Sequence, residues 1–151
     1  MLFADMIAKL NADLKNEWKH LQFYLHHASA ITGLHAHEYK EFLLEQAAGE
    51  MKHVGQFSDL LFGLGVTPTT EINEFSKLTS AKAILECAAA MEEEVVNNYV
   101  QRIAQLSTLT FHSTAEASDA KWIEIFLEEQ IKDSREDLDH LMRILKGHDN
   151  G

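Results

Sequence analysis

The chain has 151 residues, of which 46% are hydrophobic and 25% charged, a composition typical of one globular domain rather than a disordered or fibrous protein. Lys and Arg number 13 against 24 Asp and Glu, which gives a formal net charge of -11. A chain this acidic repels phosphate backbones and anionic lipids and attracts cations. We therefore expect neither nucleic acid nor a membrane surface among its partners.

The single cysteine, Cys87, excludes an intramolecular disulfide and any metal cluster held by cysteines alone. The sequence contains no run of 18 apolar residues, so no membrane-spanning helix is predicted. The first ten residues include Asp5 and lack the basic head and apolar block of a signal peptide. These features predict a cytoplasmic protein.

One proline and seven glycines are the only strong helix breakers, and apolar residues recur at steps of three and four in four long stretches. The first stretch ends near residues 32–33, the second runs from about residue 37 to 64, and the third begins after residue 80. A polar, β-branched loop at residues 107–114 precedes the fourth.

Residues 65–79 show no periodic stripe and are too many for a hairpin between neighbouring helices, which predicts a crossover along the whole bundle. The predicted fold is all-α: an antiparallel four-helix bundle with this long crossover between helices 2 and 3. We expect the bundle to occupy residues 1–146 and a flexible tail to occupy residues 147–151.

A polar side chain interrupts the apolar stripe of each predicted helix near its middle. Glu17, Glu50 and Glu92 do so in the first three helices, and Gln130 does so in the fourth. Antiparallel packing brings these positions to one height in the core. Buried carboxylates are costly unless they are protonated, paired with bases or bound to a cation. Because few Lys or Arg share these faces, the pattern predicts a bound cation.

His53 follows Glu50 by three residues, so one helix face presents a carboxylate and an imidazole about one turn apart. A carboxylate-rich site with one nitrogen ligand suits iron or manganese better than structural zinc. Glu50 is central enough to bridge two metals. Asp133 either adds a further oxygen or belongs to a solvated helix face. Tyr24, on the stripe of Glu17, either packs in the core or places a hydroxyl near the metals.

These residues resemble the ferritin superfamily over nearly the whole chain. Glu17 followed by Tyr24 resembles the first-helix ligand and tyrosine of ferritins. The run EMKH at residues 50–53 is similar to bacterioferritin, as is its separation from Glu17.

The second half of the chain carries the same resemblance. The run LECAAAMEEEV at residues 85–95 resembles the third ferritin helix and makes Glu92 its ligand. The run FLEEQIKDSREDL at residues 126–138 resembles the fourth helix of the ferritin heavy chain, with Gln130 at its ligand position. Bacterioferritins have a second Glu-x-x-His on that helix, where this chain has Gln130 and Asp133.

The resemblance implies a ferroxidase with a di-iron centre, which oxidises Fe(II) with dioxygen or peroxide and stores ferric mineral in a large homo-oligomeric shell, with 24 subunits favoured. The implied first iron site is Glu17, Glu50 and His53, and the second shares Glu50 and adds Glu92, with Gln130 or Asp133 nearby. The implied catalytic set is Glu17, Tyr24, Glu50, His53, Glu92 and Gln130.

Met51 raises the question of a second cofactor. Bacterioferritins use the equivalent methionine to ligate haem b at a two-fold subunit interface, which makes Met51 a candidate haem ligand by resemblance. The alternative is that Met51 simply packs in that interface, as flexible methionines often do. The choice between these two roles depends on whether two subunits leave a slot for haem between them.

Two other functions remain open from the sequence. A rubrerythrin-like di-iron oxidase or peroxide scavenger is expected to have a second Glu-x-x-His and often a Cys-x-x-Cys, whereas this fourth helix has Gln130 and Asp133 and the chain has one cysteine. A non-catalytic helical assembly protein would use the acids in hydrogen-bond networks. A DNA-protecting mini-ferritin fits less well, because its ligands lie between subunits.

Overall fold

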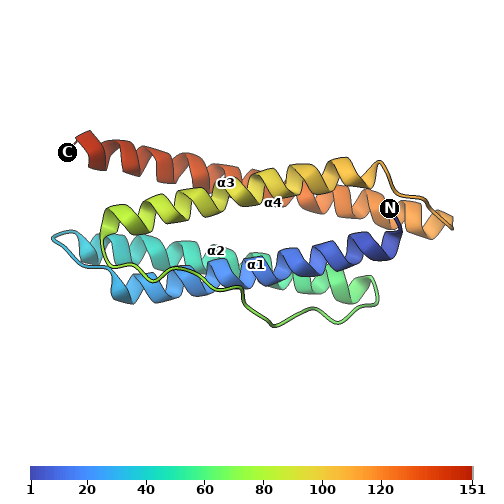
Figure 1. Cartoon of the computed structure of the whole chain (residues 1–151), viewed down its shortest axis with the longest axis horizontal. Coiled ribbons are helices and arrows are strands. Elements are labelled where there is room, and N and C mark those ends of the chain that lie inside the picture. The colour runs from blue at the N-terminus through green and yellow to red at the C-terminus, as the bar shows by residue number, and fades with distance from the viewer. Residues whose placement is uncertain (151) are drawn as a thin grey trace.

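The computed structural model describes the backbone of residues 1–150 and the side chains of residues 1–147. The helices are α1 (Phe3–Ala30), α2 (Ala36–Gly63), α3 (Ala81–Leu106) and α4 (Thr114–Asn150). α1 pairs with α2, and α3 pairs with α4, as two antiparallel hairpins that lie side by side (Figure 1). The predicted all-α four-helix bundle is confirmed. α4 continues past the predicted boundary at Gly147, and residue 151 lies outside the described residues.

The crossover between α2 and α3 runs back along the length of the bundle beside α1 (Figure 1). Its backbone bonds to α1 side chains at several heights. The Asn11 Oδ1 accepts from the Thr69 amide at 2.8 Å, and the Trp18 indole donates to the Thr69 carbonyl at 3.0 Å. Farther along, His27 Nε2 accepts from the Leu78 amide at 3.0 Å. The expected long crossover is therefore present and held to the first helix.

Local chemistry sets the helix ends. The Ser80 side chain accepts from the Ala83 amide at 3.2 Å, which caps the start of α3 as hydroxyl side chains commonly do. Gly33 and Gly65 adopt φ of +111° and +85° just after α1 and α2, a left-handed conformation that other residues rarely adopt. These residues place both joints close to where the sequence predicts them.

Apolar side chains fill most of the bundle interior above and below its middle. Fully buried side chains include Leu10, Leu14, Phe57, Leu61, Leu85 and Ile123. This continuous core fixes the rotation of each helix, since each apolar stripe must face inward. No helix in the described part of the chain is long and apolar enough to span a membrane.

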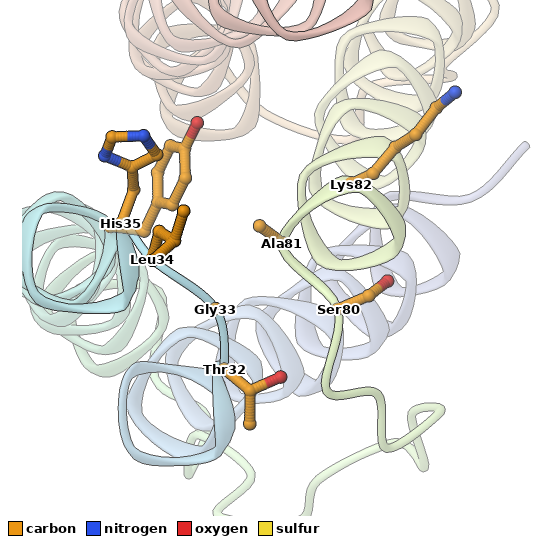
Figure 2. Close-up of a pocket in the computed structure, with 8 residues that line it drawn as sticks. Thr32, Gly33, Leu34, His35, Ser80, Ala81 and Lys82 are labelled. Atoms are coloured by element: carbon orange, nitrogen blue, oxygen red, sulfur yellow. The ribbon is translucent and has the colours of Figure 1, made fainter.

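A hollow of about 360 Å³ opens at one end of the bundle (Figure 2). Thr32, Gly33, Leu34 and His35 line it on one side and Ser80, Ala81 and Lys82 on the other, and Tyr39 completes the lining. From Glu17 to the end of α1 at Ala30 is about 20 Å, at about 1.5 Å per residue. The hollow is therefore separate from the polar middle of the bundle described next.

Candidate metal centre

Five polar side chains meet at mid-height of the bundle, and each is at most 3% exposed. We call this set the central cluster: Glu17 and His20 from α1, Glu50 and His53 from α2, and Glu92 from α3. The helix period explains why they meet, because each glutamate occupies a position of its helix where apolar neighbours also face inward.

The cluster contains two overlapping groups of possible metal ligands. Ligand atoms of Glu17, Glu50 and His53 lie within 4.8 Å of one another, and we call this set the first triad. The same holds for His20, Glu50 and Glu92, the second triad. Metal–ligand bonds of about 2.0–2.6 Å let one cation reach three atoms so spaced. Because Glu50 belongs to both triads, its carboxylate can bridge two cations. Four of the predicted ligands thus lie close together: Glu17, Glu50, His53 and Glu92. His20 joins them, although the sequence did not lead us to predict it as a ligand.

The first triad holds opposite charges. His53 Nδ1 lies 3.3 Å from Glu50 Oε2 and 3.8 Å from Glu17 Oε2. Burial acts to lower the pKa of His53, but hydrogen bonds to Glu17 and Glu50 outweigh it and raise that pKa to about 11. Burial likewise acts to raise the pKa of Glu17, but its bonds with His53 and Glu50 lower it to about 2. The Tyr99 hydroxyl donates to Glu17 Oε1. Near neutral pH, Glu17 is therefore ionised and His53 protonated.

The groups of the second triad favour their neutral forms. Burial, followed by the charges of Asp137 and Glu17, raises the pKa of Glu92 to about 8. Burial and the Glu17 charge raise the pKa of Glu50 well above its usual range. Burial lowers the pKa of His20 to about 4, which leaves a neutral imidazole at pH 7. The Tyr24 hydroxyl donates to Glu92 Oε1 at 3.0 Å.

Several buried atoms in and beside the cluster have no hydrogen-bond partner. They are Glu17 Oε2, His20 Nδ1, Glu92 Oε2 and Gln130 Oε1. A buried polar atom without a partner costs about 1–3 kcal/mol, so native proteins contain few of them. A divalent cation would bind the carboxylate and imidazole atoms and remove that cost. The donor set, three carboxylates and two imidazoles, therefore fits the di-iron type of site that the sequence predicts.

The two predicted residues of α4 both contact side chains of α2. Gln130 is buried, and its Nε2 donates to Gln56 Oε1 on α2 at 2.8 Å. Asp133 Oδ2 lies 3.2 Å from Nε2 of His53, the ring nitrogen opposite the one that faces Glu50. Carboxylates in this position typically orient a metal-binding imidazole. The structure thus brings Asp133 to the site from its outer side, and its role remains a prediction.

A hollow of about 240 Å³ reaches His53 from the surface between α2 and α4. It is lined by Gly49, Lys52, His53, Asp133, Glu136 and Asp137. Its three carboxyl groups outnumber Lys52 and the protonated His53, so the hollow favours cations over anions. Burial raises the pKa of Asp137 to about 6, so this group is still largely ionised at pH 7.

The family model of the ferritin-like domain matches residues 7–147. The chain belongs to the ferritin-like family. Comparison with curated proteins found no match. Among solved structures, this ferritin-like chain is similar to a ferritin-like, diiron-carboxylate protein from Bacillus anthracis, with 24% identity and a TM-score of 0.82 over 95% of this chain and 96% of that one.

Two bacterioferritins show the same fold. The Rhodobacter capsulatus bacterioferritin, described with a metal-free dinuclear site and a haem iron, has 20% identity and a TM-score of 0.84, covering 97% of this chain and 87% of that one. Mycobacterium tuberculosis bacterioferritin BfrA has 19% identity and a TM-score of 0.81, covering 97% and 87%. At these identities the likeness establishes the ferritin-like fold.

Met51 lies on the outer surface of α2 in this ferritin-like bundle, with 61% of the residue exposed. Its thioether points away from the central cluster, where its neighbour Glu50 is 1% exposed. A surface methionine fits either a subunit interface or one half of a haem slot, and both uses remain predictions.

Sequence reasoning missed several residues that the fold brings to the cluster. His20 had a visible signal, because Glu17 and His20 form a second Glu-x-x-His, on α1. Tyr99 and the ion pair between the buried Asp13 and the partly buried Arg102 had no local signal, since each depends on a contact between α1 and α3. The ferritin-like centre thus has a tyrosine donor on each side, Tyr24 and Tyr99.

Proposed function

We propose that this protein oxidises Fe(II) at the central cluster and handles the ferric product as an iron-storage or detoxification protein. The observation that carries the proposal is the shared Glu50, which belongs to two buried ligand triads from three helices. Two positions joined by one carboxylate suit a reaction that needs two electrons from two metal ions. The ferritin-like family supports the proposal, as does the Bacillus anthracis relative described as a diiron-carboxylate protein.

The donor chemistry favours iron oxidation. Carboxylate oxygens are hard ligands, so they stabilise Fe(III) relative to Fe(II) when the substrate iron is bound between them. Two Fe(II) ions give one electron each to dioxygen, which takes up two protons and leaves as hydrogen peroxide. Peroxide as oxidant would instead take two electrons and two protons and leave as two waters.

The protein's own side chains balance the charge of the entering cations and line their route to the cluster. At pH 7, Glu92 and His53 carry protons that they must release to bind cations, and the raised pKa of Glu50 acts in the same direction. This release offsets the positive charge that enters the buried site. The acid-lined hollow beside His53 gives Fe(II) a route from solvent. Tyr24 holds Glu92 in place through its hydroxyl.

Storage of the product requires a shell, and this part of the proposal rests on surface chemistry. Large apolar side chains are exposed on all four helices, including Leu25 on α1, Met51 and Phe62 on α2, Val100 on α3 and Trp122 on α4. Where such side chains form a contiguous patch, they mark a surface that another subunit covers. We propose a large homo-oligomer, with 24 subunits favoured, and haem b at Met51 where two subunits meet. A mass measured by light scattering and a visible absorption spectrum test these two statements.

The decisive experiment compares Fe(II) oxidation by the wild type and Glu50→Ala, followed by the rise in ferric absorbance in aerated buffer. We expect the wild type to oxidise Fe(II) faster than buffer alone. The variant should fall to the buffer rate, because both triads lose their shared ligand. Glu45→Ala is the matched control, since Glu45 is exposed on the same helix.

Glu50→Gln guards against loss of folding, because it keeps the side-chain volume and removes the charge that a bridging ligand needs. Far-UV circular dichroism checks that both variants remain helical. A full oxidation rate in folded Glu50→Ala contradicts the proposed function.

A further inference from the structure

His20 is the polar residue of the central cluster that sequence reasoning did not assign. It lies on α1, three residues after Glu17, and is 1% exposed. One of its ring nitrogens lies within 4.8 Å of ligand oxygens of both Glu50 and Glu92. The ring therefore belongs to the wall of the second triad and not to the apolar packing around it.

The bonding of the ring is incomplete. His20 Nδ1 is buried and has no hydrogen-bond partner. Nε2 lies 3.4 Å from the Asn16 side-chain amide, one helical turn away. Rotating that amide by 180° exchanges its nitrogen and oxygen, and its oxygen can then accept from an N–H at Nε2. Nδ1 would then keep a free lone pair, a buried acceptor that a cation can use.

His53 shows the same arrangement on the neighbouring helix. Its Nδ1 faces Glu17 and Glu50, while its Nε2 contacts the side chain of Asp133. In metal sites, the outer ring nitrogen typically donates to a polar side chain, and this bond fixes the ring and its tautomer. Asn16 contacts Nε2 of His20, just as Asp133 contacts Nε2 of His53. The antiparallel hairpin of α1 and α2 thus presents two Glu-x-x-His pairs to one cluster.

We propose that His20 is a nitrogen ligand of the cation at the second triad, so that each of the two metal positions has one imidazole. Both imidazoles then come from the α1–α2 hairpin. This inference rests on the proposed function only in requiring that the cluster binds metal. It adds a nitrogen donor to the second position, which strengthens binding of the later divalent metals over manganese.

The test counts imidazole ligands directly, without iron oxidation. The protein is loaded anaerobically with Co(II), a paramagnetic divalent ion, to two ions per chain. In the proton NMR spectrum, the N–H of each cobalt-bound imidazole gives a strongly shifted, solvent-exchangeable signal. We expect two such signals from the wild type and one from His20→Leu, which removes the donor and fills its space with an apolar side chain of similar size.

His27→Gln is the matched control, because His27 is a fully buried histidine of the same helix whose ring bonds to Phe23 and Leu78. It should retain both signals. Should His20→Leu fail to fold, His20→Gln keeps a polar side chain beside Asn16 and must still lose one signal, since the signal reports imidazole alone. Co(II) titrations should show that the second ion binds at least ten-fold more weakly in either variant.

The possible outcomes separate this inference from the proposed function. One imidazole signal in the cobalt-loaded wild type, or two in a folded His20 variant, overturns the role of His20 and leaves iron oxidation standing. Two signals in a protein that does not oxidise Fe(II) support His20 and contradict the ferroxidase. A wild type that binds no Co(II) overturns the role of His20.

Discussion

Asp13 and Glu92 are both buried carboxylic acids in the same bundle, yet their surroundings differ. Asp13 on α1 is 5% exposed and accepts two bonds from the Arg102 guanidinium, at 2.9 and 3.0 Å. Glu92 on α3 is 0% exposed, accepts one bond from Tyr24 and has an oxygen without a partner. Burial alone therefore does not mark a binding site. An acid that already has a base needs no further partner, and an acid without one is available to a cation.

The largest expected effect on stability comes from removing Arg102, the base that pairs with Asp13. Burial raises the pKa of Asp13 to about 6, and Arg102 limits that rise, so the carboxylate is ionised at pH 7. Arg102→Met leaves this charge buried without a partner. We expect a loss of about 3 kcal/mol in the free energy of unfolding at pH 7, measured by urea denaturation at fixed protein concentration. The loss should shrink at pH 5, where Asp13 can take up a proton.

Arg135→Ala is the matched control, because Arg135 pairs with Asp139 on the exposed surface of α4. Its effect should stay under about 0.5 kcal/mol. Equal losses in the two variants would contradict the structural role assigned to the pair of Asp13 and Arg102.

The two tyrosine donors give the next largest effect. Tyr99 donates to an ionised Glu17, whereas Tyr24 donates to a Glu92 that carries a proton at pH 7. Hydrogen bonds to charged groups contribute about 1.5–3 kcal/mol, and neutral ones about 0.5–1.5 kcal/mol. In the metal-free protein, Tyr99→Phe should therefore destabilise more than Tyr24→Phe. Denaturation of both variants checks this order, and the reverse order would mean that the charges are assigned to the wrong triads.

The smallest expected effect is the contribution of Glu92 to the pH dependence of stability. Burial raises the pKa of Glu92 from 4.5 to about 8, so from pH 7 to 8 the folded protein holds a proton that the unfolded chain has lost. Stability must then fall as pH rises. Glu50 and His53, whose pKa values are also raised, act in the same direction. We expect the free energy of unfolding of the metal-free protein to fall between pH 7 and 9.

Glu92→Gln isolates the contribution of Glu92 to the change in stability with pH, because it keeps the side-chain volume and removes the titrating group. The fall in stability should be smaller by about 1 kcal/mol per pH unit just above pH 7. Urea denaturation at pH 7, 7.5 and 8 measures the two slopes. Parallel slopes would show that Glu92 is already ionised at pH 7.

The fold could be predicted almost completely because its signals are local. The apolar period and a few breakers place the helices, and the start predicted near His37 for the second helix is one residue from the observed Ala36. The glutamates could also be predicted, since each interrupts a stripe that must face the core. Pairings between helices could not. Gln56 meets Gln130, and Arg102 meets Asp13, only after the rotation and height of the helices are set.

His20 lies between these cases. The spacing from Glu17 repeats that of Glu50 and His53, so a local signal existed. The position lies beside the apolar stripe of α1, where a histidine is more often half-exposed. Its burial follows from the approach of α3, which carries Glu92, and that approach cannot be derived from α1 alone.

Because the bundle consists of two hairpins, the two triads form at different stages of folding. The first triad takes Glu17, Glu50 and His53 from α1 and α2, so it is complete once that hairpin forms. The second triad needs Glu92 from α3, and the long crossover must first bring the other hairpin alongside. Docking of the hairpins and assembly of the second position are therefore one event. A cation bound there acts as a cross-link between the two halves of the chain, and its binding free energy adds to their cohesion.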